Sequence, residues 1–233
     1  MPFESPLTEA VLLRRYKRFL ADVRLPCGEE LTVHCPNTGS MKNCGGPGSR
    51  VWVRLVSAAG RKLPGTWELV ETAPGELACI HSARANRVIA SGLEAGLITP
   101  LTGFAARRAE VCLRSGGSRF DFLLSDPVDC AVEVKSVTLA LDAGEGAFPD
   151  AVSLRGQKHL LELTDLAEAG QRACLLFCVM HGGIDRVRPA DEIDPLYAAL
   201  LRKAYRAGVQ VLAWSVIPSP EGLLIGGELP VLL

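Results

Sequence analysis

Two neighbouring segments indicate the fold of the C-terminal half of the chain: Arg119-Phe120-Asp121-Phe122-Leu123-Leu124 and Cys130-Ala131-Val132-Glu133-Val134-Lys135-Ser136-Val137. Both place charged residues among bulky apolar ones, and Ser125-Asp126-Pro127 follows the first segment. Aromatic and β-branched runs bounded by turn residues are typical of strands. The two segments therefore predict consecutive antiparallel strands.

Three charged residues stand out in this strand pair: Asp121, Glu133 and Lys135. Glu133 and Lys135 are two residues apart, so they project from the same face of their strand. A hairpin that closes at residues 126–129 lays Asp121 beside them. Two carboxylates supply oxygen ligands for Mg²⁺, and a neighbouring lysine stabilises negative charge that develops on a phosphate. The pattern predicts a site for a hard cation.

A plainer interpretation stays open for the same residues. Alternating valines also describe a half-exposed strand whose Glu133 and Lys135 face solvent, and an acid-x-lysine pair is common by chance. The presence of Asp121 one hairpin earlier, and of a helix directly afterwards, adds weight to the cation site. It does not decide between the two interpretations.

The rest of the C-terminal half alternates strands and helices. The pattern predicts a first strand at Glu110–Arg114 and a helix at about Ser153–Glu168 that ends at Gly170. A strand buried on both faces follows at Ala173–Met180. Asp194 begins a helix at Pro195–Ala207, and a last strand lies at Val209–Val216. The order βββ-α-β-α-β implies a mixed sheet, with an antiparallel meander followed by right-handed parallel crossovers.

The first eighty residues consist of short predicted strands punctuated by Gly, Pro and Asn, at Val11–Val23, Glu29–His34, Arg50–Val56, Thr66–Glu71 and Glu76–Ile80. Five short strands without a clear helix suggest a small barrel of the oligonucleotide-binding (OB) type, while an SH3-like barrel or an open sheet fits nearly as well. A short helix at Ser82–Glu94 marks the junction. We expect an α/β (α+β) protein of two domains, at 1–85 and 86–233.

Composition and hydropathy indicate a globular protein that stays out of the membrane. The 233 residues are 48% hydrophobic and 22% charged, which is unlike a disordered chain. The longest apolar stretch, Ala173–Met180, is far shorter than the ~20 residues that cross a bilayer. No signal peptide is evident, so we expect a cytoplasmic protein. The eight cysteines include no C-x-x-C pair, which favours buried free thiols over disulfides.

Charge is divided unevenly along the chain. Residues 1–90 hold 12 Lys/Arg and 8 Asp/Glu, whereas residues 91–233 hold 13 and 18. Four of the N-terminal cations crowd the first strand: Arg14, Arg15, Lys17 and Arg18. A cationic barrel face suits the backbone of a nucleic acid, with Tyr16 or Phe19 available to stack on bases. A charged, solvated edge strand has the same pattern.

The loop from His34 to Met41 places proline, asparagine and glycine before small polar residues. This is turn chemistry, and a turn alone explains it. The backbone amides of such a loop also suit a phosphate, which makes Asn37 a candidate DNA contact. No role is assigned to His159, because the sequence shows no acid or cysteine partner for it.

Several segments resemble known families. Asp121 with Glu133-Val134-Lys135 resembles the metal site of the PD-(D/E)XK nuclease superfamily. Along nearly its whole length the chain resembles the sugar fermentation stimulation protein A (SfsA) family of prokaryotes. The segments that carry this second resemblance are Arg15–Asp22, His34–Met41, Arg119–Phe122, Glu133–Leu139 and Phe148–Ala151 with Arg155–Leu160.

The resemblance implies an OB-like N-terminal domain, a restriction-endonuclease-like C-terminal domain with a mixed sheet flanked by helices, and DNA binding. Asp121 and Glu133 match the metal ligands of the superfamily, and Lys135 matches its catalytic lysine. Glu110 matches an auxiliary acid of many members. Gln157 matches a glutamine on the following helix in RecB-like members.

At one position the chain departs from the RecB-like pattern. The glutamine is often followed four residues later by tyrosine, whereas Leu161 follows Gln157 here. Gln157 therefore lacks the residue that completes the pattern. The name of the SfsA family reflects a presumed regulatory role in sugar metabolism, which no residue of this chain explains.

We therefore expect a DNA-binding protein with a nuclease site that depends on Mg²⁺ or Mn²⁺. Asp121, Glu133 and Lys135 form the expected site, with Gln157 as a further catalytic candidate and Glu110 as a further metal ligand. The alternative is a DNA-binding transcriptional regulator that keeps the nuclease fold without turnover. Non-specific or weakly specific DNA binding is common to both. No membrane partner is expected, and a homodimer remains open.

Overall fold

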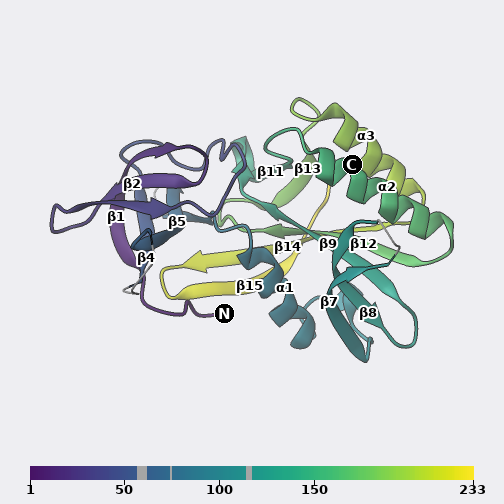
Figure 1. Cartoon of the computed structure of the whole chain (residues 1–233). Helices are drawn as coiled ribbons and strands as arrows, with labels where there is room; N and C mark the ends of the chain where they lie inside the picture. The colour runs from purple at the N-terminus through teal and green to yellow at the C-terminus, as the bar shows by residue number, and fades with distance from the viewer. Residues whose placement is uncertain (57–61, 74, 114–116) are drawn as a thin grey trace.

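The computed structural model describes residues 1–56, 62–73, 75–113 and 117–233 (Figure 1). Its N-terminal part contains β1 (Thr8–Tyr16), β2 (Leu20–Arg24), β3 (Glu30–His34), β4 (Arg50–Leu55), β5 (Gly65–Ala73) and β6 (Glu76–Cys79). These strands lie in the order β3-β2-β1-β4-β5-β6, and a parallel pairing of His34 with Thr66 joins β3 to β5. That pairing closes β1 to β5 into a barrel. The prediction of an OB-like domain is confirmed.

One predicted strand is in fact a hairpin. The run at 11–23 turns back between Tyr16 and Leu20, which pair across the turn. Lys17 and Arg18 lie in the turn with φ of 50° and 64°. The turn contains no glycine, proline or asparagine, so the composition of the run hides it. These two cations lie at the tip of the hairpin and not on the face of a continuous strand.

The C-terminal part contains the following elements: α1 (Arg84–Glu94), η1 (Thr99–Leu101), β7 (Ala106–Cys112), β8 (Arg119–Ser125), β9 (Cys130–Val137), β10 (Leu139–Ala140), η2 (Asp142–Gly144), β11 (Glu145–Phe148), α2 (Leu154–Glu168), β12 (Arg172–Val179), β13 (Arg186–Pro189), α3 (Pro195–Arg206), β14 (Gln210–Ser219) and β15 (Gly222–Leu229). The end of the predicted first strand, Arg114, lies outside the described residues.

The large C-terminal sheet has the order β15-β14-β12-β9-β8-β7. Strands β7, β8 and β9 are antiparallel neighbours, whereas β9, β12 and β14 are parallel. The predicted meander with parallel crossovers is confirmed. A second, small sheet of β10, β11 and β13 was not predicted. Its strands have two to four residues, too few for an alternating pattern to show.

Helices cover both faces of the large sheet (Figure 1). Along β12, Leu175 and Phe177 lie in one buried cluster with α2 and α3, whereas Cys174 and Leu176 lie in another with α1. This alternation confirms a strand buried on both faces. Among the described residues, no helix combines the length and the apolar composition needed to cross a bilayer.

The barrel and the sheet share part of one hydrophobic core. Trp52 and Leu69 of the barrel lie in the same buried cluster as Leu176 of the sheet and the apolar face of α1. Backbone hydrogen bonds add to this contact, because the N–H of Cys79 donates to the carbonyl of Met180 at 2.8 Å. The two parts therefore pack as one body.

A buried ion-pair network ties α1 to the barrel. Glu68 of β5 has a fully buried side chain that accepts hydrogen bonds from Arg84 at 2.6 and 2.8 Å and from Arg54 at 3.0 Å. It also lies 2.7 Å from Nδ1 of His81. Arg84 in turn donates to Glu4 at 2.9 Å. Burial opposes ionisation of Glu68, but the hydrogen bonds of Arg84 and His81 lower its pKa to about 2.

Most of the cysteines are the buried free thiols that the sequence predicts. None of those in the described chain forms a disulfide, and all are buried except Cys27 and Cys112. Burial raises the pKa of the Cys79 thiol to about 12, which leaves it protonated near neutral pH.

Candidate metal and substrate site

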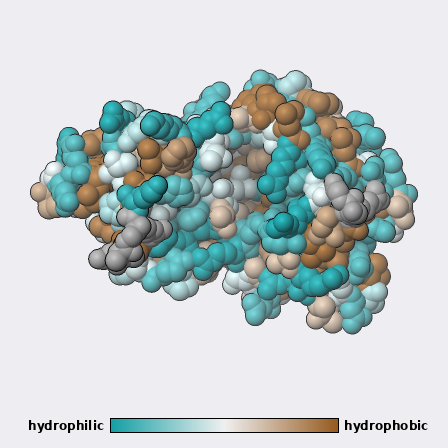
Figure 2. Space-filling model, viewed as in Figure 1, coloured by the Kyte–Doolittle hydropathy of each residue, from teal (hydrophilic) through white to brown (hydrophobic). Residues whose placement is uncertain are grey.

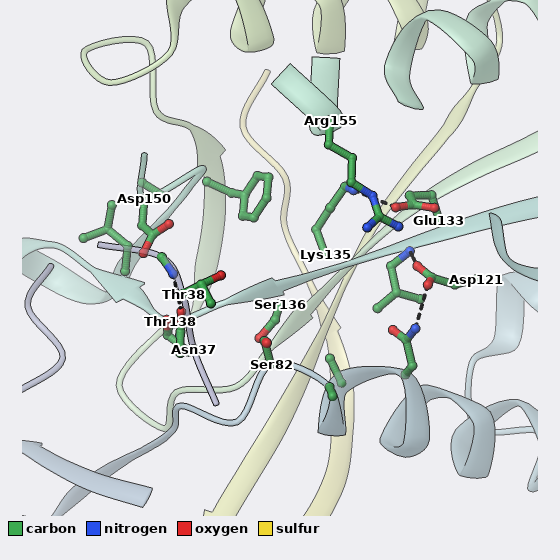
Figure 3. Close-up of a pocket in the computed structure, with 18 residues that line it drawn as sticks. Asn37, Thr38, Ser82, Asp121, Glu133, Lys135, Ser136, Thr138, Asp150 and Arg155 are labelled. Carbon is green, nitrogen blue, oxygen red and sulfur yellow. Dashed lines mark hydrogen bonds and ion pairs between the residues drawn. The ribbon is translucent and has the colours of Figure 1, made fainter. Parts of the chain in front are cut away.

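A cavity of about 380 Å³ lies between the barrel and the large sheet. The molecular surface is hollowed between these two parts (Figure 2). In the close-up, Asn37 and Asp150 lie on one side of the cavity and Asp121, Glu133 and Arg155 on the other (Figure 3). Both parts of the chain therefore contribute to its walls.

The structure brings together the three charged residues of the predicted site. Asp121 comes from β8, and Glu133 and Lys135 come from β9. The Nζ atom of Lys135 donates to Oε1 of Glu133 at 2.6 Å. The N–H of Val134 donates to Oδ2 of Asp121 at 2.7 Å. Glu133 is only 3% exposed, so it does not face solvent as a half-exposed strand would require.

The pKa values of the two carboxylates are shifted in opposite directions. Burial, and then the charge of Glu133, raise the pKa of Asp121. Burial also opposes ionisation of Glu133, but the hydrogen bond with His159 and the charge of Lys135 hold the pKa of Glu133 below its ordinary value. A cation bound to both carboxylates would relieve the repulsion between them.

One carboxylate oxygen of this pair is buried and has no hydrogen-bond partner among the described residues. This atom is Oε2 of Glu133, whereas Oε1 contacts Lys135 and His159. Each oxygen of Asp121 accepts one hydrogen bond and keeps a further lone pair. Leaving a buried acceptor unpaired is costly, so a ligand at Oε2 is favoured.

The donor atoms available here fit a hard divalent cation. Carboxylate oxygens are the ligands of Mg²⁺, Mn²⁺ and Ca²⁺, and Mg²⁺ in particular keeps several waters. The described part of the chain contains no group of three or more His, Cys, Asp and Glu side chains placed to hold a metal. Water and substrate would therefore complete the coordination of a metal held by Asp121 and Glu133.

Asn86 also lies at this site and was not predicted. It sits on α1, and its Nδ2 donates to Oδ1 of Asp121 at 2.6 Å (Figure 3). Together with the N–H of Val134, this amide fixes the orientation of the Asp121 carboxylate. α1 reaches β8 only through the folding of the whole domain, so local spacing carries no signal for this contact.

His159 and Arg155 of α2 were also missed. Nδ1 of His159 contacts Oε1 of Glu133 and lies 3.2 Å from Nζ of Lys135. Nε of Arg155 lies 3.4 Å from Nε2 of His159, and Arg155 lines the cavity. The two residues are four apart and so share one face of the helix. That spacing, on the helix after the acid-x-lysine strand, was the available signal.

The structure does not bring Glu110 or Gln157 to the cavity. Glu110 has a φ of 56° on β7, an exposed side chain and an ion pair with Arg119 at 3.3 Å. Gln157 donates to both oxygens of Asp194, the N-cap of α3, at 2.9 and 3.1 Å. It lies two residues from His159, and the turn of the helix points the two side chains to different neighbours. Their predicted roles as metal ligand and catalytic residue have no geometric support.

Two of the four cations predicted to bind DNA are occupied within the barrel. Arg14 pairs with Asp22 at 2.7 Å. Nη2 of Arg15 donates to backbone carbonyls, among them that of Asn37 at 2.9 Å. The other two lie at the β1–β2 hairpin tip, where Arg18 lines a second cavity of about 400 Å³. Of these four described cations, Lys17 and Arg18 are the two placed to meet a partner without giving up such contacts.

Comparison with known proteins places the chain in a family. The model described as "SfsA N-terminal OB domain" matches residues 13–80, and "Sugar fermentation stimulation protein RE domain" matches residues 83–222. The chain belongs to the SfsA family. The family member named "Sugar fermentation stimulation protein homolog" from Pseudomonas aeruginosa (strain LESB58) is 55% identical over 235 residues, which cover 100% of both chains.

Other SfsA proteins agree in length and fold. The homolog from Pseudomonas fluorescens (strain SBW25) is 54% identical and is likewise covered over 100% of both chains. A solved structure, "The structure of Pyrococcus Furiosus SfsA in complex with Ca2+", has a TM-score of 0.89 and 28% sequence identity. It covers 100% of this chain and 98% of the Pyrococcus chain. The two-domain fold is therefore that of a known SfsA structure.

Proposed function

We propose that the protein is a metal-dependent hydrolase of phosphodiester bonds in nucleic acid. The observation that carries the proposal is the unpartnered, buried Oε2 of Glu133, which lies at a cavity shared with Asp121 and Lys135. A relative of the same fold is a Ca²⁺ complex, which supports divalent-cation binding here as well.

Each residue of the site has a role in this proposal. Asp121 and Glu133 hold Mg²⁺ or Mn²⁺, which when bound supplies a Lewis acid and a more acidic water. Asn86 keeps the Asp121 carboxylate oriented. Lys135, held 2.6 Å from Glu133, stabilises the negative charge that develops on the phosphate. Arg155 lines the same cavity and adds a positive charge that attracts the phosphate.

The barrel brings the nucleic acid to the site. Small OB barrels bind oligonucleotides on their strands and loops. Lys17 and Arg18 at the hairpin tip supply cations for the backbone, independent of base sequence. This picture predicts binding to DNA that is non-specific or weakly specific.

Titration of the protein with metal, followed by calorimetry, tests metal binding at the site. Gel assays of labelled DNA in Mg²⁺, Mn²⁺ or EDTA test DNA binding and cleavage. Asp121→Asn and Glu133→Gln keep side-chain size and remove charge, so metal binding should collapse and cleavage should stop. Without metal, DNA binding should stay equal or tighten, because repulsion with phosphate is relieved. Glu110→Gln is the matched control, since its exposed carboxylate lies outside the cavity.

The outcomes separate the two functions. Cleavage by the wild-type protein that both cavity variants lose supports the hydrolase. Metal binding at Asp121 and Glu133 without cleavage of DNA or RNA would favour a DNA-binding regulator on a nuclease-like fold. If Glu110→Gln lowers metal affinity as much as the cavity variants do, the assignment of the site is wrong.

A further inference from the structure

The barrel supplies the wall of the cavity that faces the carboxylate pair. This wall is a loop that follows β3, and its cavity-lining residues are Asn37, Thr38 and Gly39. In the close-up, Asn37 and Thr38 stand across the cavity from Asp121 and Glu133 (Figure 3). A substrate phosphate at the carboxylates therefore has the barrel loop as its neighbour.

Asp150 of the C-terminal part forms hydrogen bonds with this loop. Its Oδ2 accepts the N–H of Met41 at 3.0 Å, and Oγ of Ser40 lies 2.7 Å from its carbonyl oxygen. A Cβ atom added to Gly39 would lie 2.7 Å from Oδ2 of Asp150, which leaves no space between the two. The loop is thus packed directly against the C-terminal part.

The barrel braces the same loop from the other side. Nη2 of Arg15 donates to the carbonyls of Asn37 and Gly39, both at 2.9 Å. Oδ1 of Asn37 accepts the N–H of Gly39 at 2.8 Å. Further along, Nδ2 of Asn43 donates to the carbonyl of Ala140 at 2.9 Å. Widening the cavity by moving the loop would break several of these bonds together.

The cavity is too small to enclose a double helix. A sphere of the cavity's volume is about 9 Å across, whereas the major groove of B-DNA alone is about 12 Å wide. A duplex therefore cannot bring both strands between the loop and the carboxylates. One unpaired strand can enter, because a single nucleotide is of the size that such ligand cavities hold.

The side chains of the cavity suit an unpaired nucleotide. Asn37 and Thr38 on the wall, and Ser82 and Ser136 between wall and carboxylates, offer neutral hydrogen-bonding groups (Figure 3). Exposed base edges and sugars pair with such groups, and Phe148, whose ring packs against Phe177 and Tyr197, lines the same cavity. The carboxylates attract the metal, and this wall meets the sugar and base.

We infer that the substrate is single-stranded nucleic acid, with one nucleotide seated between the carboxylate pair and the wall formed by Asn37, Thr38 and Gly39. The inference rests on the proposed function for its chemistry and adds the class of substrate. DNA and RNA share the phosphate, sugar and base that the cavity would contact, so the test includes both.

Fluorescence anisotropy in Ca²⁺ measures entry into the cavity without relying on turnover. The probes are a labelled 12-nucleotide DNA strand, the matching RNA strand and a blunt DNA duplex of the same length. Thr38→Trp fills the cavity from an exposed position, so the fold should tolerate it. Ser91→Trp is the matched control, because Ser91 is a small, exposed polar residue of α1 outside the cavity.

Thr38→Trp should weaken binding of the single strand by about tenfold, which is the loss expected for one stacked base, and should change duplex binding by no more than about twofold. Ser91→Trp should change neither. Equal affinity of Thr38→Trp and wild type for the strand overturns the inference, as does wild-type protein that binds no strand. A Thr38-dependent preference for DNA or RNA identifies which sugar the wall accepts, and either supports the inference.

Cleavage in Mg²⁺ separates this inference from the proposed function. Thr38-dependent strand binding without cleavage leaves the single-strand inference standing and refutes the hydrolase. Cleavage of a blunt duplex as fast as of the single strand supports the hydrolase and refutes the single-strand inference. Faster cleavage of the strand, reduced by Thr38→Trp but not by Ser91→Trp, supports both.

Discussion

Replacing Arg84 with methionine removes the cation that α1 presents to the barrel. The guanidinium is 2% exposed and makes two hydrogen bonds to Glu68, whose side chain is fully buried. Methionine fills similar space but leaves Glu68 with Arg54 and His81 alone. The variant therefore keeps a buried carboxylate and removes its main partner.

Arg84 and His81 together lower the pKa of Glu68 from 4.5 to about 2, which by linkage corresponds to roughly 3 kcal/mol of stability near neutral pH for the whole network. Breaking a buried ion pair from one side typically costs about 3–5 kcal/mol. We expect Arg84→Met to lower the free energy of unfolding by about 3 kcal/mol at pH 7.

The dependence on pH gives the sign of the effect. Because the folded pKa of Glu68 is lowered, its contribution is fully present above pH 4.5 and is lost as the pH falls toward 2. The difference between wild type and Arg84→Met should shrink over that range. Urea titrations followed by tryptophan fluorescence, at pH 7 and in steps down to pH 3, measure it.

Arg87→Met is the matched control for this experiment. Arg87 lies on the same helix as Arg84 and pairs with Glu4, but its side chain is 57% exposed, and exposed pairs contribute about 0–1 kcal/mol. If Arg84→Met costs no more than Arg87→Met, or if its cost is the same at pH 7 and pH 3, the reasoning about the buried network is refuted.

Three further predictions concern the site, the barrel and α3. Lys135→Ala should retain metal binding, measured by calorimetry, and slow cleavage by about 10²–10³-fold; an unchanged cleavage rate would remove Lys135 from the chemistry. Replacing Lys17 and Arg18 with alanine should lower the slope of log Kd against log salt concentration by up to about two, measured between 50 and 200 mM salt. A slope equal to that of the wild type would count against phosphate-backbone contacts at these residues. Asp194→Ala should lower stability by at least about 1–2 kcal/mol, because it removes the cap of α3 and the partner of buried Gln157, whereas Asp191→Ala at an exposed pair should cost less; equal losses would contradict the structural role of Asp194.

The crossover part of the fold was predictable because its signals are local. Ser153 and Asp194 cap the two helices through hydrogen bonds to Gly156 and Tyr197, three residues along the chain. Continuous apolar runs mark the buried strands between the helices. The β1–β2 turn was not predictable, because Lys17 and Arg18 adopt positive φ without the residues that usually signal it.

The candidate site divides in the same way. Asp121, Glu133 and Lys135 lie on one hairpin, so strand periodicity and a short turn were enough to bring them together. Asn86 and Asp150 reach the cavity only when separate elements close around it, and spacing in the chain does not encode that. Glu110 and Gln157 came from resemblance to a superfamily pattern, and the structure gives both of them other partners.

The core shared by the barrel and the sheet bears on how such proteins are inherited. Trp52 and Leu69 are packed against the C-terminal part, and Glu68 depends on Arg84 across the junction. A recombination event that exchanged one half for that of a distant relative would leave these residues without their packing and ion-pair partners. Selection should therefore act on the two halves as one heritable unit. Relatives from Pseudomonas and Pyrococcus match this chain along its whole length.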